Sequence, residues 1–193
     1  MLEKNQLRAQ YLRLRKKKYF EITKEFFLPI KKLLRSYLRK KNFKIALYYP
    51  SNYEINVLKL LENKYLKNTK ILIPLIEESN FMNFYPWKKN EVLLVNKFGL
   101  LEPVRSKAQT PDVILVPILS FDKKKYRLGY GKGFYDRYLN KYLKNLKNIL
   151  TVGVAFSFQR HHKLPITKKD VKLDLPIDYN PKDFKDVQEK RQA

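Results

Sequence analysis

The residues best suited to chemistry lie between Arg127 and Leu139, in the run Arg-Leu-Gly-Tyr-Gly-Lys-Gly-Phe-Tyr-Asp-Arg-Tyr-Leu. Three of the chain's 5 glycines alternate here, at positions 129, 131 and 133. Glycine lets a ligand approach the backbone closely, and a glycine loop that opens a helix presents free N–H groups to an anion. Arg127 and Lys132 add positive charge, and Asp136 follows. This combination indicates a site for nucleotide phosphates and a divalent metal ion.

The glycine spacing alone does not specify a nucleotide. Gly-x-Gly-x-Gly is neither the P-loop pattern nor the dinucleotide-binding fingerprint. The alternative is a flexible surface turn before an ordinary helix, in which Asp136 only complements the positive end of the helix dipole. The arginine before the glycines, the lysine among them and the aspartate one turn later favour the phosphate site.

Together with Pro117, Phe121 and Asp122, this stretch resembles the signature of the 5-formyltetrahydrofolate cyclo-ligases, also called methenyltetrahydrofolate synthetases. The family pattern is approximately Pro-Gly-x-x-Phe-Asp, followed by Arg-Leu-Gly-x-Gly-(Gly/Lys)-Gly-Tyr-Tyr-Asp; this chain has Phe134 at the first tyrosine. The resemblance implies a three-layer α/β/α fold of the NagB/RpiA/CoA-transferase type. It also implies ATP- and Mg²⁺-dependent conversion of 5-formyltetrahydrofolate to 5,10-methenyltetrahydrofolate through a phosphorylated formyl intermediate, with release of ADP and phosphate.

The same resemblance implies which residues bind ATP. The family opens with Lys-x-x-Leu-Arg on a helix that reaches the phosphates, and Lys4-Asn5-Gln6-Leu7-Arg8 matches it. Lys132 and Arg127 are the expected catalytic residues, with Lys132 stabilising charge on the transferred phosphoryl group. The full expected set for ATP is Lys4, Arg8, Arg127, Leu128, Gly129, Tyr130, Gly131, Lys132, Gly133, Phe134 and Tyr135.

For the folate, the resemblance implies Tyr49, Glu54 and the loop residues Tyr130, Gly131, Lys132, Gly133 and Phe134. A carboxylate can accept paired N–H donors from an aminopyrimidine ring. Taken by itself, however, Ser51-x-x-Glu54 before an apolar run is a capping box, so Glu54 has a structural interpretation as well. One carboxylate could serve both roles.

Two aspartates are expected to hold Mg²⁺, again by resemblance. They are Asp136, in the signature, and Asp170, which follows Leu164-Pro165 as in the family. Lys169 stands where the family has His or Asn beside that aspartate, which puts a cation next to a proposed ligand. Asp174 is therefore an alternative second ligand.

Hydrophobic periodicity predicts the elements that must position these residues. Helices are expected over residues 2–18, about 23–40 and 134 to about 146, and a helical pattern follows residue 54. Strands are expected at 45–49, 71–76, 113–116 and 150–156, whereas the aromatic run 81–87 is expected to be an irregular packed loop. Strands that alternate with helices predict an α/β fold with a mostly parallel sheet. We expect one domain over residues 1–193, with a frayed tail from about residue 181.

The chain carries 42 Lys+Arg against 18 Asp+Glu, a formal net charge of +24. Compositional bias is the first explanation, steering of anionic ligands the second and nucleic-acid binding the third. Neither thiolate metal sites nor disulfides are possible without cysteine, and no apolar run is long enough to span a membrane. We expect a monomeric enzyme that acts on a small molecule in the cytoplasm. The alternatives are a basic nucleic-acid-binding protein without catalysis, or a family relative that uses ATP on a different substrate.

Overall fold

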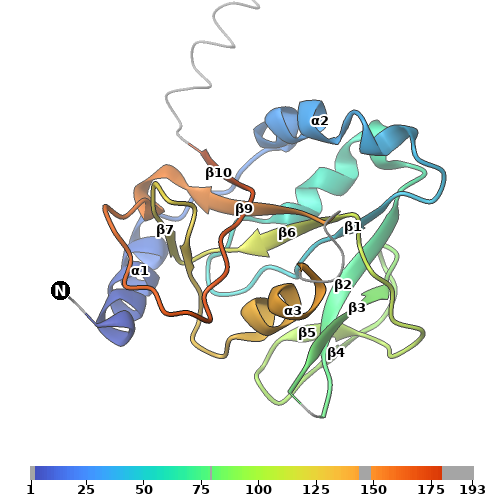
Figure 1. Cartoon of the computed structure of the whole chain (residues 1–193). Coiled ribbons are helices and arrows are strands. Elements are labelled where there is room, and N and C mark those ends of the chain that lie inside the picture. Colours follow the sequence, from blue (N-terminus) through green and yellow to red (C-terminus); the bar gives the residue numbers. More distant parts are fainter. Residues whose placement is uncertain (1–2, 79, 144–148, 180–193) are drawn as a thin grey trace, which may run out of the picture.

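The computed structural model describes residues 3–78, 80–143 and 149–179, which form an α/β structure around one main sheet (Figure 1). In this part of the chain the sheet has six strands in the order β10-β9-β6-β1-β2-β3. Neighbouring strands are parallel except for the antiparallel pair β2–β3. The strands are β1 (Lys44–Ala46), β2 (Lys70–Ile76), β3 (Met82–Pro86), β6 (Val113–Pro117), β9 (Leu150–Phe156) and β10 (Leu175–Tyr179).

Residues of the central strands alternate between two buried layers. Val113 and Leu115 belong to a cluster on one face of the sheet, and Ile114 and Val116 belong to a cluster on the other. The first cluster includes residues of α2 (Leu28–Leu34), and the second includes residues of α3 (Phe134–Leu143). Figure 1 shows α2 above the sheet and α3 below it. The predicted mostly parallel α/β fold is therefore confirmed, since parallel sheets bury both faces.

Two small antiparallel hairpins flank the sheet and help to build the site. β4 (Leu93–Val95) pairs with β5 (Leu101–Pro103), and β7 (Ser120–Phe121) pairs with β8 (Arg127–Leu128). Helix α1 (Lys4–Lys18) lies beside the second hairpin (Figure 1). Its apolar residues pack in a third cluster, which consists of Leu7, Tyr11, Leu119, Leu128 and Leu164. Because β8 runs directly into the glycine loop, this cluster fixes α1 next to that loop.

The predicted helix over residues 23–40 is wrong in its extent. The segment divides into η1 (Lys24–Phe27), α2 and η2 (Tyr37–Arg39), where η denotes a 3-10 helix. Pro29 occupies the first turn of α2, where its missing N–H costs nothing, and the α-helix therefore starts at Leu28. The helical pattern after residue 54 also forms 3-10 turns, η3 (Val57–Glu62) and η4 (Lys64–Leu66), and η5 (Ser157–Gln159) follows β9.

The aromatic run 81–87 is not an irregular loop, as predicted, but contains strand β3. Antiparallel pairing with β2 sets Phe84 opposite Pro74, and both Met82 and Phe84 are buried in the cluster below the sheet. The strand expected at 45–49 is shorter, since β1 ends at Ala46; the Leu47 N–H still donates to the Leu72 carbonyl oxygen, and Leu47 and Tyr48 are buried. The last residues of the third predicted helix and the predicted frayed tail lie outside the described residues. In the described part of the chain, no helix has the length and apolar character to cross a membrane.

Gly153 in β9 tests the packing between the sheet and the layer below it. A Cβ at this position would lie 2.3 Å from Ile118 Cδ1 and 2.6 Å from Leu173 Cδ1. We expect Gly153→Ala to lower the free energy of unfolding by about 1–3 kcal/mol through overpacking. Urea denaturation measures this change. Gly129→Ala is the matched control, because its Cβ would meet nothing within 4 Å; equal stability of the two variants would contradict the packing described here.

Candidate active site

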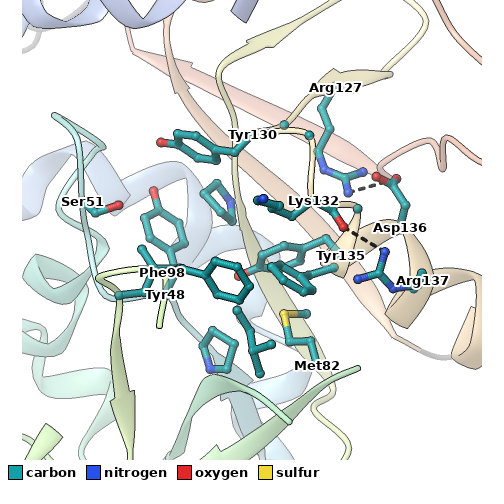
Figure 2. A pocket seen from close by; sticks show the side chains of 18 of the residues that line it. Tyr48, Ser51, Met82, Phe98, Arg127, Tyr130, Lys132, Tyr135, Asp136 and Arg137 are labelled. Atoms are coloured by element: carbon teal, nitrogen blue, oxygen red, sulfur yellow. Dashed lines mark hydrogen bonds and ion pairs between the residues drawn. The ribbon is translucent and has the colours of Figure 1, made fainter. Parts of the chain in front are cut away.

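A pocket of about 710 Å³ opens at the carboxyl ends of the parallel strands, where α/β sheets commonly bind ligands (Figure 2). Its wall is built from the segments that follow β1 and β6, the ends of β2 and β3, the β4–β5 hairpin, α1 and the start of α3. Every residue that the sequence predicts for the site lines this pocket. Asp174, the alternative metal ligand, does not; its Oδ2 accepts hydrogen bonds from the backbone and side chain of Thr151.

The glycine loop has a conformation that depends on its glycines. Gly131 and Gly133 have φ of 95° and 68°, in the left-handed region that other residues rarely adopt. A Cβ at Gly131 would lie 3.1 Å from Cζ of Arg8, so the arginine packs directly on the loop backbone. Arg8 Nε also donates a hydrogen bond to the Gly129 carbonyl oxygen, at 2.9 Å. The loop ends at the first residue of α3, so the helix N-terminus and its free N–H groups face the same region.

The two predicted catalytic cations have different surroundings. Lys132 Nζ lies 5.5 Å from the centre of the Phe98 ring, and Figure 2 shows the lysine beside Phe98 in the pocket. None of the ion pairs among the described residues involves Lys132. The Arg127 side chain is only 5% exposed, and its guanidinium lies 3.0 Å from Asp136 Oδ1. Lys132 is therefore free to meet an anionic ligand, whereas Arg127 already neutralises an aspartate.

The two predicted metal ligands each keep one oxygen available. Asp136 Oδ1 forms the ion pair with Arg127 and accepts a hydrogen bond from the Val171 N–H. Asp170 accepts through Oδ2, from Lys4 Nζ at 2.6 Å and from Thr167. Neither Asp136 Oδ2 nor Asp170 Oδ1 has a hydrogen-bond partner among residues 3–78, 80–143 and 149–179. Two such oxygens suit Mg²⁺, which takes few protein ligands and completes its shell with phosphate and water.

The environment keeps Asp170 ionised. Partial burial acts to raise the pKa of this carboxyl, but hydrogen bonds from Lys4 and Thr167 outweigh burial and hold the pKa below its usual value. The described residues contain no group of three or more acidic, histidine or cysteine side chains that could enclose a metal ion. A metal at Asp136 and Asp170 would complete its shell with oxygens from a bound phosphate and from water.

Glu54 is the buried carboxylate on the other side of the pocket. Its Oε1 accepts a hydrogen bond of 2.6 Å from the Tyr130 hydroxyl, and its Oε2 accepts one of 2.9 Å from the Ser51 N–H. The capping-box alternative is correct about the Ser51–Glu54 contact, but no helix starts there: the two residues close a turn in which Asn52 and Tyr53 have positive φ. Burial raises the Glu54 pKa, and the Arg15 charge and the hydrogen bonds from Tyr130 and Ser51 oppose that rise.

Flat apolar and aromatic side chains form the remaining walls. The rings of Phe98 and Phe134 are 5.6 Å apart, and Met82 lines the same pocket as Phe98 (Figure 2). Tyr135 also lines the pocket; its buried hydroxyl has no hydrogen-bond partner in the described part of the chain, and burial raises its pKa. An unpaired buried hydroxyl beside open space is suited to a ligand contact.

Sequence reasoning missed three residues that shape the site. Phe98 is placed by the β4–β5 hairpin, and Glu102 holds this hairpin to β2 by accepting a hydrogen bond from the Ile76 N–H at 2.7 Å. No sequence spacing marks Phe98, whereas Glu102 lies in the run Gly99-Leu100-Leu101-Glu102-Pro103, which resembles a family pattern but gave no role for the glutamate. The third, Arg15, carried a usable signal: with Lys4, Arg8 and Tyr11 it follows the spacing of one helix face.

Known proteins resemble this chain over most of its length. The model of the 5-formyltetrahydrofolate cyclo-ligase family matches residues 1–177. The 5-formyltetrahydrofolate cyclo-ligase of Haemophilus influenzae is 31% identical over 136 residues, 67% of this chain and 72% of its own length. A probable 5-formyltetrahydrofolate cyclo-ligase of Schizosaccharomyces pombe is 30% identical over 159 residues, 75% of this chain and 78% of its own length.

Two solved structures share the fold. The 5,10-methenyltetrahydrofolate synthetase of Mycoplasma pneumoniae superimposes with a TM-score of 0.69 and 26% identity, over 91% of this chain and 98% of that one. The corresponding protein of Aquifex aeolicus gives a TM-score of 0.69 and 31% identity, over 92% of this chain and 90% of that one. On the extent of these matches and the shared signature, the chain belongs to the 5-formyltetrahydrofolate cyclo-ligase family.

Proposed function

We propose that this chain catalyses the ATP-dependent conversion of 5-formyltetrahydrofolate to 5,10-methenyltetrahydrofolate, with release of ADP and phosphate. The observation that supports this most is the union of two kinds of site in one pocket. A glycine loop with Lys4, Arg8 and Lys132 suits phosphates, and Glu54 with aromatic walls suits a flat ring that carries N–H donors. The reaction requires both ligands in contact.

The chemistry explains why ATP is consumed. The formyl oxygen is a poor leaving group, and a formamide carbon is a poor electrophile. Transfer of the γ-phosphoryl group to the formyl oxygen releases ADP and makes the carbon reactive. The second nitrogen of the same folate then attacks that carbon, and the oxygen leaves as part of phosphate. Such a sequence needs positioning and charge neutralisation rather than a protein nucleophile.

Each cation has a distinct proposed role. Lys132, which lies in the pocket without an ion-pair partner in the described chain, stabilises negative charge on the transferred phosphoryl group. Arg127 acts beside it by holding Asp136 in place. Lys4, Arg8 and the backbone N–H groups of the glycine loop bind the remaining phosphates. Loop side chains complete the ATP site, and those proposed are Leu128, Tyr130, Phe134 and Tyr135.

Mg²⁺ is proposed at Asp136 and Asp170, whose available oxygens fit a hard cation. When bound, Mg²⁺ would neutralise phosphate charge and favour phosphoryl transfer. Lys4 and Arg127 neutralise the same two carboxylates through ion pairs. These ion pairs reduce the repulsion between Asp136, Asp170 and the negatively charged phosphates of ATP.

For the folate, we propose that Glu54 accepts hydrogen bonds from the aminopyrimidine edge. Glu54 Oε1 retains capacity for one more hydrogen bond beyond its contact with Tyr130, whereas Oε2 already accepts from the Ser51 N–H and, at 3.4 Å, from the Ser51 hydroxyl. Tyr49, Phe134 and Phe98 line the slot for the flat ring. Because one chain provides the whole pocket, we propose a single-domain monomer that works on small molecules in the cytoplasm.

Lys132→Ala provides the test of phosphoryl stabilisation. Loss of this cation should lower kcat by about 10²–10³-fold, because the charge that it stabilises develops only during the reaction. The measurement is the absorbance of methenyltetrahydrofolate formed from 5-formyltetrahydrofolate, ATP and Mg²⁺. Lys97→Ala is the matched control, since Lys97 Nζ also lies over Phe98, at 5.4 Å, but does not line the pocket. Full activity of Lys132→Ala would reject its role, and no turnover by the unchanged chain would reject the proposed function.

Asp136→Asn tests the metal site. Replacing one of two carboxylate ligands should raise the Mg²⁺ concentration that gives half-maximal rate by at least about ten-fold. The assay is a Mg²⁺ titration at saturating ATP. Asp174→Asn serves as the control, because the structure places Asp174 outside the pocket. A larger change of the Mg²⁺ requirement in Asp174→Asn than in Asp136→Asn would contradict the assignment.

A further inference from the structure

Arg15 is a buried cation that the catalytic roles above do not use. It lies on α1 with only 1% of its surface exposed. One terminal nitrogen donates to the Ile118 carbonyl oxygen at 3.3 Å, the other donates to the Tyr130 hydroxyl, and Nε has no partner among the described residues. Burying a charge with an unsatisfied donor is costly, and an apolar residue of similar size would often stabilise a fold better. This cost points to a functional reason for the arginine.

The hydrogen bonds of Arg15 lead directly to Glu54. The Tyr130 hydroxyl accepts from Arg15 and donates to Glu54 Oε1, at 2.6 Å. The guanidinium carbon also lies 5.5 Å from the centre of the Tyr130 ring. Tyr130 is thus held by contacts on its ring and on its hydroxyl, and three segments far apart in the sequence meet in one chain of hydrogen bonds.

The groups around Glu54 determine how strongly the Arg15 charge affects its carboxyl group. Tyr130 faces the carboxylate from the glycine loop, Tyr48 from the segment after β1, and Tyr135 from α3. All three are neutral phenols, and burial of the carboxyl raises its pKa. Arg15 supplies positive charge that lowers the pKa again. A charged acceptor binds N–H donors more strongly than a neutral carboxylic acid, which has also lost one acceptor position.

We propose that Arg15 is a positioning residue which, through Tyr130, holds Glu54 as an oriented carboxylate for the N–H donors of the substrate ring. The inference deepens the proposed function and rests on it for the identity of that ring. It also gives α1 two tasks at opposite ends. Lys4 and Arg8 serve the phosphate side of the pocket, and Arg15, further along the same helix, serves the folate side.

The experiment compares Arg15→Met, Arg15→Lys and Arg13→Met over about pH 6 to 9, in steady-state assays with each substrate varied in turn. Arg13 is the matched control because it is an exposed arginine on the same helix. In Arg15→Met we expect the folate KM near pH 6 to rise by about ten-fold or more, the worth of a charge-assisted hydrogen bond. The ATP KM should change much less.

The pH dependence follows from the sign of the Glu54 shift. Loss of Arg15 raises the Glu54 pKa further, so Glu54 is protonated over a wider range at low pH. As pH rises through the new pKa, the carboxylate returns and the folate KM of Arg15→Met should approach the unchanged chain's value. Arg15→Lys, which keeps the charge, should restore most of the original profile. A pH-independent loss that affects both substrates equally, or a profile identical to that of Arg13→Met, would overturn the proposal.

A second readout does not require activity. Carbon NMR of glutamate-labelled protein, with Glu54→Gln to assign the signal, gives the Glu54 pKa directly. It should be at least about one unit higher in Arg15→Met than in the unchanged chain, and equal values would overturn the proposal. If Arg15→Met does not fold, Tyr130→Phe tests the same connection by removing one hydroxyl. Absence of turnover in the unchanged chain would reject the proposed function and, with it, the role of Arg15 in substrate binding. The NMR titration of Glu54 would still show whether Arg15 and Glu54 are coupled.

Discussion

The attachment of α1 to the glycine loop is the constraint on which the rest of the site depends. Arg8 donates to the Gly129 carbonyl oxygen, and Arg15 donates to the Tyr130 hydroxyl, so the helix contacts two neighbouring loop residues. The apolar cluster that includes Leu7 and Leu128 fixes the helix against the hairpin that leads into the loop. A loop with two glycines at positive φ has little conformational preference of its own. The helix therefore defines the shape of the loop, and it brings cations to the pocket by the same contacts.

The pocket separates charges that are fixed from charges that can respond to a ligand. Arg127 and Lys4 are paired with Asp136 and Asp170, whereas Lys132 faces an aromatic ring. An aromatic ring stabilises a cation that lies over it. A phosphate can then bind this cation without first displacing a carboxylate. The chain's formal charge of +24 is consistent with attraction of anionic ligands, whereas the specificity proposed for the site rests on these few buried or half-buried groups.

The sequence predicted the sheet correctly, and the residues predicted for the glycine-loop site line one pocket, because both predictions depend on local patterns. The apolar run Val113–Val116 and the signature after Arg127 need no information about distant segments. The prediction failed where tertiary contacts decide: β3 is a strand because β2 pairs with it, and Phe98 reaches the pocket because Glu102 holds its hairpin. The helix expected at 23–40 was wrong because Pro29 begins a new helix rather than sitting inside one. Arg15 was overlooked although it shares a helix face with Lys4 and Arg8, because the many lysines and arginines of this helix mask that spacing.

In the proposed reaction, the pocket brings the terminal phosphate of ATP to the formyl oxygen of the folate. The decisive measurement is turnover of 5-formyltetrahydrofolate that carries a heavy oxygen isotope in its formyl group, with mass analysis of the released phosphate. We expect one heavy oxygen in each phosphate formed, because that oxygen leaves the folate as part of the transferred group. Unlabelled phosphate, released together with ADP and methenyltetrahydrofolate, would contradict it.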